Sequence, residues 1–240
     1  MRRFRRIFTV FLLVLLLTGS AAAMDTGFEV QPLSPEETAR VSNKEIILQK
    51  EKPKTGSILC FDVREDGLIA LGFQTPNDSE ERIVCILDSN GAFQYAYRFA
   101  CVGSFGLEWS GEHLLVYFVR SDLVMELDAA GNAVQWADIL DTTENNRYWY
   151  TVRERERVVE DRVYRIKNDM GIFNLIVSSY SQLTVTNASA EEVLIYDVNQ
   201  EQLIKTVVFT GAIALFVGCA VYIATIKPIM ETSGKKGAKT

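Results

Sequence analysis

The stretch CILDSNGAFQYAY, residues 85–97, joins an apolar run to an alternating run through an Asp-x-x-Gly turn. The pattern returns 40 positions later as MELDAAGNAVQWA, residues 125–137. Asp at the first position of a type I turn accepts a hydrogen bond from the backbone two residues on, and Gly tolerates the positive φ that re-enters the second strand. Both stretches therefore predict β-hairpins whose turn residues have a structural role. These residues are Asp88, Gly91, Asp128 and Gly131.

Strand-like runs precede both hairpins in the same order. Residues 60–74 (CFDVREDGLIALGFQ) hold a strand, a Gly-bearing turn and a second strand, and residues 106–119 (GLEWSGEHLLVYFV) repeat that order. A looser third copy is expected over residues 164–207, with Asp197 opening its last turn and Asn199-Gln200 in place of the glycine. Each copy is predicted to contain four antiparallel strands.

Four-stranded units that recur at about forty residues resemble the blades of β-propellers, loosely those of the NHL or YVTN type. The resemblance covers roughly residues 58–207 and implies an all-β fold, an incomplete propeller or a curved stack of antiparallel sheets, because three blades do not close a ring. Residues 44–51 could add an outer edge strand, and residues 142–162 an extra hairpin. An ordinary antiparallel sandwich without true repeats is the alternative. The chain also resembles membrane-anchored proteins of Gram-positive anaerobic bacteria.

Two apolar runs lie near the ends of the chain. Residues 1–23 combine four arginines, an apolar stretch and a small-x-small site, which is typical of a signal peptide, although an uncleaved anchor is the alternative. Residues 207–226 contain no charged side chain and are long enough to span a bilayer as a helix. Lysines follow this run, so we expect the C-terminus in the cytoplasm and the main domain outside it.

The expected organisation follows from these runs. It comprises a signal peptide or anchor (1–23), a linker with a possible edge strand (24–57), an extracytoplasmic β-repeat domain (58–205), a transmembrane helix (206–227) and a basic cytoplasmic tail (228–240). The protein is therefore expected to cross the membrane once, or twice if the N-terminal helix is retained.

The charge is unevenly distributed. The two end segments hold eight of the 25 basic residues but only Glu231 of the 31 acidic ones, so the domain between them carries a net charge of about −13. An acidic surface repels phosphate backbones, and nucleic acid is excluded as an expected partner. The expected partners are the lipid bilayer, through the C-terminal helix, and either another protein or a second copy of the chain.

Candidate chemistry is sparse. Three cysteines, Cys60, Cys85 and Cys101, lie in strand-like runs, and the alternatives are three buried thiols or a Cys60–Cys85 disulfide. His113 is the single histidine, and no spacing suggests a metal, so no cofactor and no catalytic residue are predicted. We expect a binding or scaffolding module. The alternative is a cell-envelope hydrolase acting on saccharide or peptide through carboxylates that converge only in the fold.

Two segments are candidate contact surfaces. Arg147, Tyr148, Trp149 and Tyr150 have a composition favoured at interfaces, although strand alternation would also allow Trp149 to be core. In the apolar C-terminal run, Gly211, Ala214 and Gly218 share one helix face, and such small residues allow close helix approach. The charged stretch 153–162 is expected to be a solvated strand or helix face, or a guard at a sheet edge.

Overall fold

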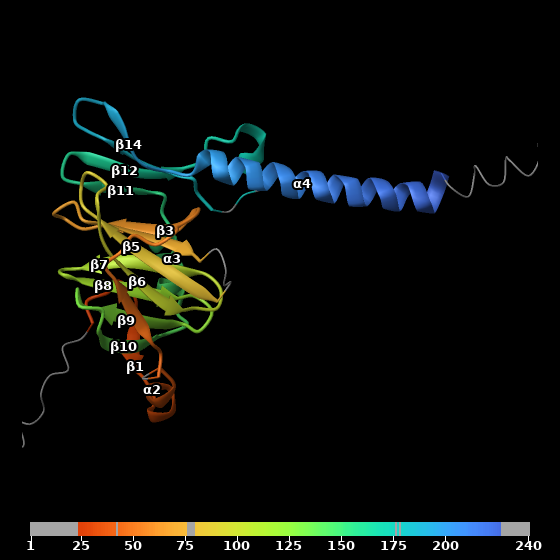
Figure 1. The fold of residues 1–240 in the computed structure, drawn as a ribbon. Coiled ribbons are helices and arrows are strands. Elements are labelled where there is room, and N and C mark those ends of the chain that lie inside the picture. Colours follow the sequence, from red (N-terminus) through yellow and green to blue (C-terminus); the bar gives the residue numbers. More distant parts are fainter. Residues whose placement is uncertain (1–23, 42, 76–79, 176, 178, 227–240) are drawn as a thin grey trace, which may run out of the picture.

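The computed structural model describes residues 24–41, 43–75, 80–175, 177 and 179–226, so the expected signal segment and the cytoplasmic tail lie outside the described residues. The described chain forms three antiparallel sheets and one long C-terminal helix (Figure 1). The first sheet contains β2 (Ile46–Gln49), β3 (Ile58–Val63), β4 (Ile69–Gln74), β5 (Glu81–Leu87) and β6 (Phe93–Ala100). The second contains β1 (Val30–Pro32), β7 (Phe105–Ser110), β8 (His113–Phe118), β9 (Leu123–Leu127) and β10 (Ala133–Ile139). The third contains β11 (Glu156–Val159), β12 (Arg162–Lys167), β13 (Gln182–Thr186) and β14 (Glu192–Asp197).

Each sheet is built on four consecutive strands, each paired with the next in the chain. The first two units therefore occur as predicted, as β3 to β6 and β7 to β10. The predicted outer strand before the first unit is also present, because β2 pairs antiparallel with β6. A second outer strand, which the sequence did not reveal, is β1 on β10.

The two Asp-x-x-Gly turns have the same geometry. In each, the Asp Oδ1 accepts two backbone N–H bonds, at 2.9 and 2.9 Å for Asp88 and at 2.9 and 2.8 Å for Asp128. The glycines at the fourth position have φ values of 84° for Gly91 and 83° for Gly131. The two hairpins therefore share one turn geometry.

The third unit is shifted from its predicted position. Its last turn is not at Asp197, which ends β14, but at Asn187, where the backbone repeats the pattern: Asn187 N donates to Glu191 O at 3.1 Å and Ala190 N donates to Asn187 O at 2.9 Å. Ala190 takes the place of the glycine, with a φ of 60°. Because this copy lacks both Asp and Gly, its turn could not be recognised from composition. Its first strand, β11, comes from the charged stretch 153–162, for which a solvated face or a sheet-edge guard is expected, and it forms an edge of the third sheet.

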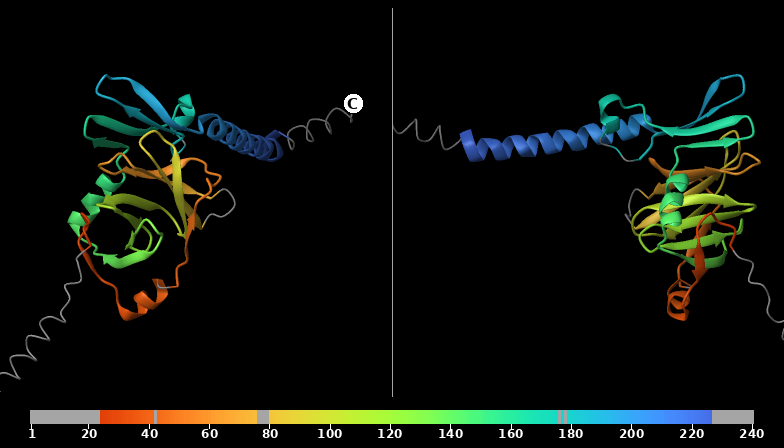
Figure 2. Two further views of the ribbon diagram at one scale, coloured as in Figure 1. Left: turned by 60° about the vertical axis from the view of Figure 1, so that its left-hand side comes forward. Right: turned by 180° about the vertical axis from the view of Figure 1, so that it is seen from behind.

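The sheets stack in the order third, first, second (Figures 1 and 2). Apolar side chains of the first sheet alternate between two cores. One core packs against the second sheet and includes Ile86 and Leu114, and the other packs against the third sheet and includes Leu71 and Leu183. Each of these four side chains is fully buried. The first sheet therefore holds the molecule together from the middle.

The two ends of the stack are finished differently. The outer face of the second sheet is covered by α3 (Thr143–Val152) and by residues 24–30, which pack on Leu115, Tyr117 and Val124. A short helix, α2 (Pro35–Val41), precedes β2. The outer face of the third sheet instead carries ion pairs between Arg165 and Glu156 and between Lys167 and Glu192. Among the described residues, the outer face of the third sheet therefore combines ion pairs with exposed apolar side chains such as Val158.

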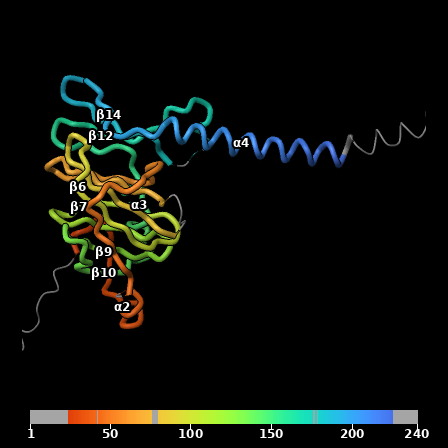
Figure 3. Tube along the Cα trace, viewed as in Figure 1, coloured from red at the N-terminus to blue at the C-terminus, as the bar shows by residue number. Residues whose placement is uncertain are grey.

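The long helix α4 (Asn199–Val221) follows β14 directly and continues as one wider turn, η2 (Tyr222–Ile226) (Figure 3). Its base is fixed to the domain, because buried Gln202 accepts from Ser57 Oγ at 2.9 Å and Asn199 accepts from Ser181 Oγ at 2.8 Å. Beyond its first turns, α4 runs away from the sheets with no described residue covering it (Figure 1). The stretch from Asn199 to Ala224 is long and apolar enough to cross a membrane.

Candidate functional site

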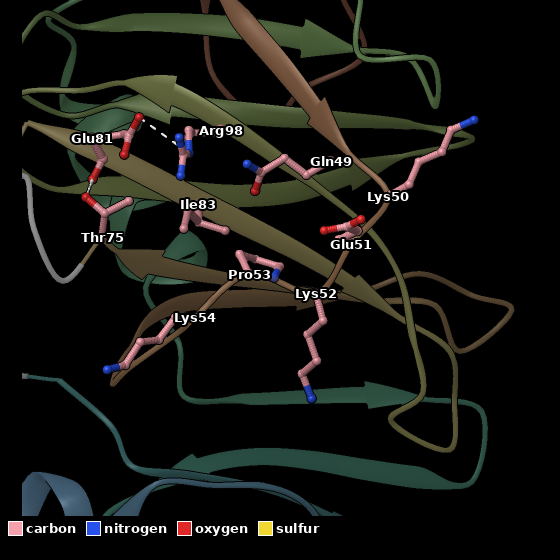
Figure 4. A pocket seen from close by; sticks show the side chains of 10 residues that line it. All are labelled: Gln49, Lys50, Glu51, Lys52, Pro53, Lys54, Thr75, Glu81, Ile83 and Arg98. Carbon is pink, nitrogen blue, oxygen red and sulfur yellow. Dashed lines mark hydrogen bonds and ion pairs between the residues drawn. The ribbon is translucent and has the colours of Figure 1, made fainter.

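A wide pocket lies against the first sheet, near the base of α4. It has a volume of about 640 Å³ and is enclosed by the segment 49–54, the facing ends of β4 and β5, and Arg98 of β6 (Figure 4). Its floor includes Ile83, which belongs to the core between the first and third sheets. The segment 49–54 leads to Ser57, whose bond to Gln202 connects this pocket to the start of α4.

The lining of this pocket is basic, although the domain as a whole is acidic. Arg98 forms an ion pair with Glu81, with 3.4 Å between Nε and Oε1. The ammonium groups of Lys50, Lys52 and Lys54 have no hydrogen bond or ion pair within the described part of the chain. Glu51 is the second acidic residue in the lining, so basic side chains outnumber acidic ones by two. This charge balance favours an anionic ligand.

A buried amide completes one wall of the basic pocket. Gln49 ends β2, and its Oε1 is buried without a hydrogen-bond partner among the described residues. A buried polar atom without a partner is costly, and such atoms commonly face water or a ligand. In Figure 4 the Gln49 side chain lies between Arg98 and Glu51 and points into the pocket. Sequence reasoning missed this site, although three lysines within five residues of an acidic chain were a visible signal.

A second, smaller hollow of about 380 Å³ brings carboxylates together near the first strands of the sheets. Its lining includes Trp109 and four acidic residues, which are Asp62, Glu65, Asp66 and Glu112. Asp62 is engaged by the protein itself: its Oδ1 accepts from Arg157 Nε at 2.7 Å, and its Oδ2 accepts from the Trp109 backbone N–H at 2.7 Å. Asp66 forms an ion pair with Arg64 at 2.6 Å. Both carboxylates are therefore paired with basic groups of the protein itself.

The Asp62 ion pair joins all three sheets. Asp62 lies on β3, Trp109 on β7 and Arg157 on β11, and these are the first strands of the three four-stranded units. Burial raises the pKa of Asp62, while Arg157 and the Trp109 N–H oppose that effect. Because a buried carboxylate is stable only when it is paired and hydrogen-bonded, this arrangement favours a structural role for Asp62.

Another carboxylate, that of the half-buried Glu108, accepts hydrogen bonds from the hydroxyls of Tyr117 and Tyr148. Burial raises the pKa of Glu108, and the two tyrosine hydroxyls act in the opposite direction. Tyr117 belongs to β8 and Tyr148 to α3, so the Glu108 carboxylate fastens the helix to the second sheet.

The aromatic cluster predicted as a contact surface lies on a helix rather than a strand. Tyr148 bonds inward to Glu108, and Trp149 packs against Phe28 with 4.7 Å between ring centroids. Arg147 and Tyr150 are exposed, and Tyr150 retains 78% of its surface. The helix begins because Thr142 caps it by accepting from the Asn145 N–H, and the helical turn then sends neighbouring aromatic residues to different faces. The four residues therefore do not form one surface.

The remaining predicted residues do not line the basic pocket. The hairpin-turn residues have structural roles: the carboxylates of Asp88 and Asp128 accept backbone hydrogen bonds, and Gly91 and Gly131 adopt a positive φ. Gly211, Ala214 and Gly218 lie on the exposed part of α4, and no described atom comes within 4 Å of a Cβ added at either glycine. Helix association through this face stays a prediction. Cys60, Cys85 and Cys101 are buried free thiols, so the disulfide alternative is not observed.

No protein-family model matches this chain, and no curated protein is similar to it. Within the described ranges, no group of three or more His, Cys, Asp or Glu side chains is arranged to hold a metal ion. The features that bear on function are the basic pocket, the Asp62–Arg157 ion pair and the uncovered helix α4.

Proposed function

We propose that the chain is a membrane-tethered binding module. In this proposal α4 spans the bilayer, and the three sheets form an incomplete β-propeller that presents a ligand pocket outside the cytoplasm. The observation that carries it is the uncovered apolar surface of α4, on which Leu215 and Phe216 retain 71% and 76% of their surface. A soluble domain has no reason to expose such side chains along a whole helix, whereas lipid tails would cover them.

The orientation rests on charge. Lysines at 227, 235, 236 and 239 follow the apolar run, and an excess of basic residues marks the cytoplasmic side of a membrane helix. The sheets at the other end of α4 would then be extracytoplasmic, in agreement with a secretory segment at residues 1–23.

Membrane fractionation tests the tether. We expect the full chain to stay with membranes through extraction at alkaline pH, and protease added to intact cells to remove the sheets while sparing an epitope after residue 227. A variant with Leu215→Asp and Phe216→Asp should lose membrane retention, because each central carboxylate costs about 3 kcal/mol on insertion. Release of the unaltered chain by alkaline extraction would refute the tether.

The ligand class follows from the pocket of residues 49–54. An anionic group would be attracted by Lys50, Lys52 and Lys54, and about 640 Å³ is enough for a small organic ligand. Inorganic pyrophosphate is a suitable probe, titrated calorimetrically into the detergent-solubilised full chain. Changing the three lysines to Gln should weaken binding about tenfold or more, which corresponds to about 1.4 kcal/mol.

A matched control removes three basic charges elsewhere. Arg120, Arg147 and Arg162 are exposed and do not line the basic pocket, so their replacement by Gln changes the net charge equally. Affinity for pyrophosphate should stay within about twofold of the unaltered chain at moderate salt, where distant charges are screened. Equal losses in both triple variants would show a general charge effect and no pocket.

A further inference from the structure

The long connection between β12 and β13 contains an uncharged, apolar turn. Residues 170–190 include no Asp, Glu, Lys or Arg, and within them η1 (Gly171–Leu175) forms one short 3₁₀ turn. Ile172 retains 80% of its surface and Leu175 retains 90%, which makes Leu175 one of the most exposed apolar side chains of the domain. Leaving two such side chains in water forfeits about 1.5–3 kcal/mol for each that could be buried.

The η1 turn is held beside the start of α4. Asn199 at the first position of α4 donates from Nδ2 to Asp169 O at 2.6 Å, and its Oδ1 accepts from the Asp169 N–H at 3.2 Å. Met170, next in the chain, is buried and fixes the turn to the domain. Figures 1 and 2 agree that the η1 connection lies alongside the first turns of α4, on the side toward which the helix runs.

The position of η1 matches the depth at which a membrane would begin. The apolar part of α4 starts at Val207, eight residues after Asn199, or about 12 Å along the helix axis. A segment projecting beside these first turns therefore reaches the headgroup and upper acyl region. Apolar side chains favour that region, and an uncharged backbone turn can enter it with its polar groups still hydrated.

We propose that Ile172 and Leu175 insert into the outer surface of the bilayer and form a second membrane contact beside α4. This inference rests on the proposed membrane span of α4. One helix alone leaves the domain free to tilt, whereas two contacts at the same end fix the stack over the lipid. The basic pocket of residues 49–54, beside the same helix base, would then be held at a constant height above the membrane.

Depth measurements with site-specific labels test this contact. In a Cys219→Ala background, where the remaining cysteines are buried, single cysteines replace Leu175, Phe216 or Val158 for coupling to an environment-sensitive fluorophore. Val158 is the matched control, because it is an apolar residue with 67% exposure on the outer face of the third sheet. The full-length variants are reconstituted in phosphatidylcholine vesicles that contain lipids with a nitroxide near the headgroup or deep in the tail.

The expected result is at least twofold quenching at 175 by the shallow nitroxide, quenching at 216 by the deep nitroxide, and none at 158. If the label at 216 is quenched and the labels at 175 and 158 are not, the second contact is refuted and the tether by α4 is retained. No quenching at 216 would overturn both. If the label at 175 is not quenched and the unlabelled Leu175→Cys chains form 175–175 crosslinks, the apolar turn contacts a second copy of the chain. That result would reject lipid as its partner.

Discussion

Ala190 adopts a φ of 60°, a left-handed conformation in which its Cβ approaches the following carbonyl oxygen. The equivalent positions of the first two units are Gly91 and Gly131, which adopt this conformation without that clash. The third unit thus retains the turn and accepts local strain at Ala190.

Ala190→Gly should raise the free energy of unfolding by about 0.5–1 kcal/mol, because relief of the left-handed clash exceeds the entropy that glycine adds to the unfolded chain. Urea unfolding of the detergent-solubilised chain, followed by circular dichroism, measures the change. Gly131→Ala is the control and should lower stability by about 1–2 kcal/mol, since its φ is 83°. A loss of stability in Ala190→Gly would contradict this account of the turn.

Glu108 gives the protein a pH dependence of unusual sign. Burial raises the pKa of Glu108 in the folded chain above its ordinary value of 4.5, so the folded chain holds this proton at pH values where the unfolded chain has released it. This contribution to stability is present at low pH and is lost as the pH rises from 4.5 through the folded pKa.

Glu108→Gln should remove that loss, because the amide stays neutral and its oxygen still accepts from a tyrosine hydroxyl. The difference in unfolding free energy between variant and unaltered chain should therefore move in favour of the variant from pH 4 to pH 7. Urea titrations at four or five pH values would show it. A difference that does not change with pH would mean that the native carboxylate is not destabilised by its burial.

Among the elements, α3 packs one face against the domain and exposes the other to solvent. Trp149 packs on Phe28 and lies near Tyr117, at 5.9 Å between centroids, whereas Tyr150 points to solvent. Trp149→Ala should lower the free energy of unfolding by about 2–4 kcal/mol, since it leaves a cavity over the second sheet. Tyr150→Ala should change it by less than about 0.5 kcal/mol. Thermal and urea unfolding of both variants would separate packing from surface composition.

The small-residue face of α4 is the element that would bring two copies together. Gly211 and Gly218 have open space around them, so a second helix could approach closely there. Gly218→Leu should reduce crosslinked dimer in vesicles about tenfold, whereas Phe216→Ala, a change on the opposite face of the helix, should leave it unaltered. Dimer yields that stay equal in all three chains would exclude association through this face.

The elements also show which signals were readable from sequence. Alternating apolar runs and the Asp-x-x-Gly turns predicted β5, β6, β9 and β10, because these residues determine local conformation by themselves. The aromatic run 148–150 is typical of a strand, because bulky aromatic side chains favour sheets. It is helical here, because Thr142 caps the start of α3. The third unit was misplaced for the opposite reason: its turn residues, Asn187 and Ala190, carry a weak signal, and the backbone adopts the turn through pairing of its neighbours.

At the scale of the whole molecule, the Asp62–Arg157 ion pair connects sheets that are distant in sequence. The two residues are 95 positions apart, and their 2.7 Å contact is shielded from solvent. No pattern in the sequence could have paired them, because pairing depends on how three sheets meet. The pocket residues 49–54 and Arg98 were equally unpredictable as a set.

Asp62→Asn should lower the free energy of unfolding by about 3 kcal/mol, since Arg157 would lose its close counter-charge and keep only Glu154, at 3.9 Å. Because Asp62 contacts all three first strands, hydrogen exchange should accelerate in β3, β7 and β11 together. Arg165→Gln is the control, as it removes an exposed ion pair and should cost less than about 1 kcal/mol. Faster exchange in β11 alone would show that the ion pair serves only the third sheet.

The even number of strands in each repeated unit determines which loops lie at the end of the sheets near α4 and which lie at the opposite end. Four strands bring the chain back to the end at which it entered, so the β12–β13 connection, the start of β3 at Ile58 and the base of α4 share one end. The turns at Gly67 and Ser89, which touch each other, lie at the opposite end, a strand length of about 20 Å away. Longer hairpin loops could be inserted there without disturbing the tethered end. Changes in the length of these hairpin loops would alter how far the domain extends from the membrane.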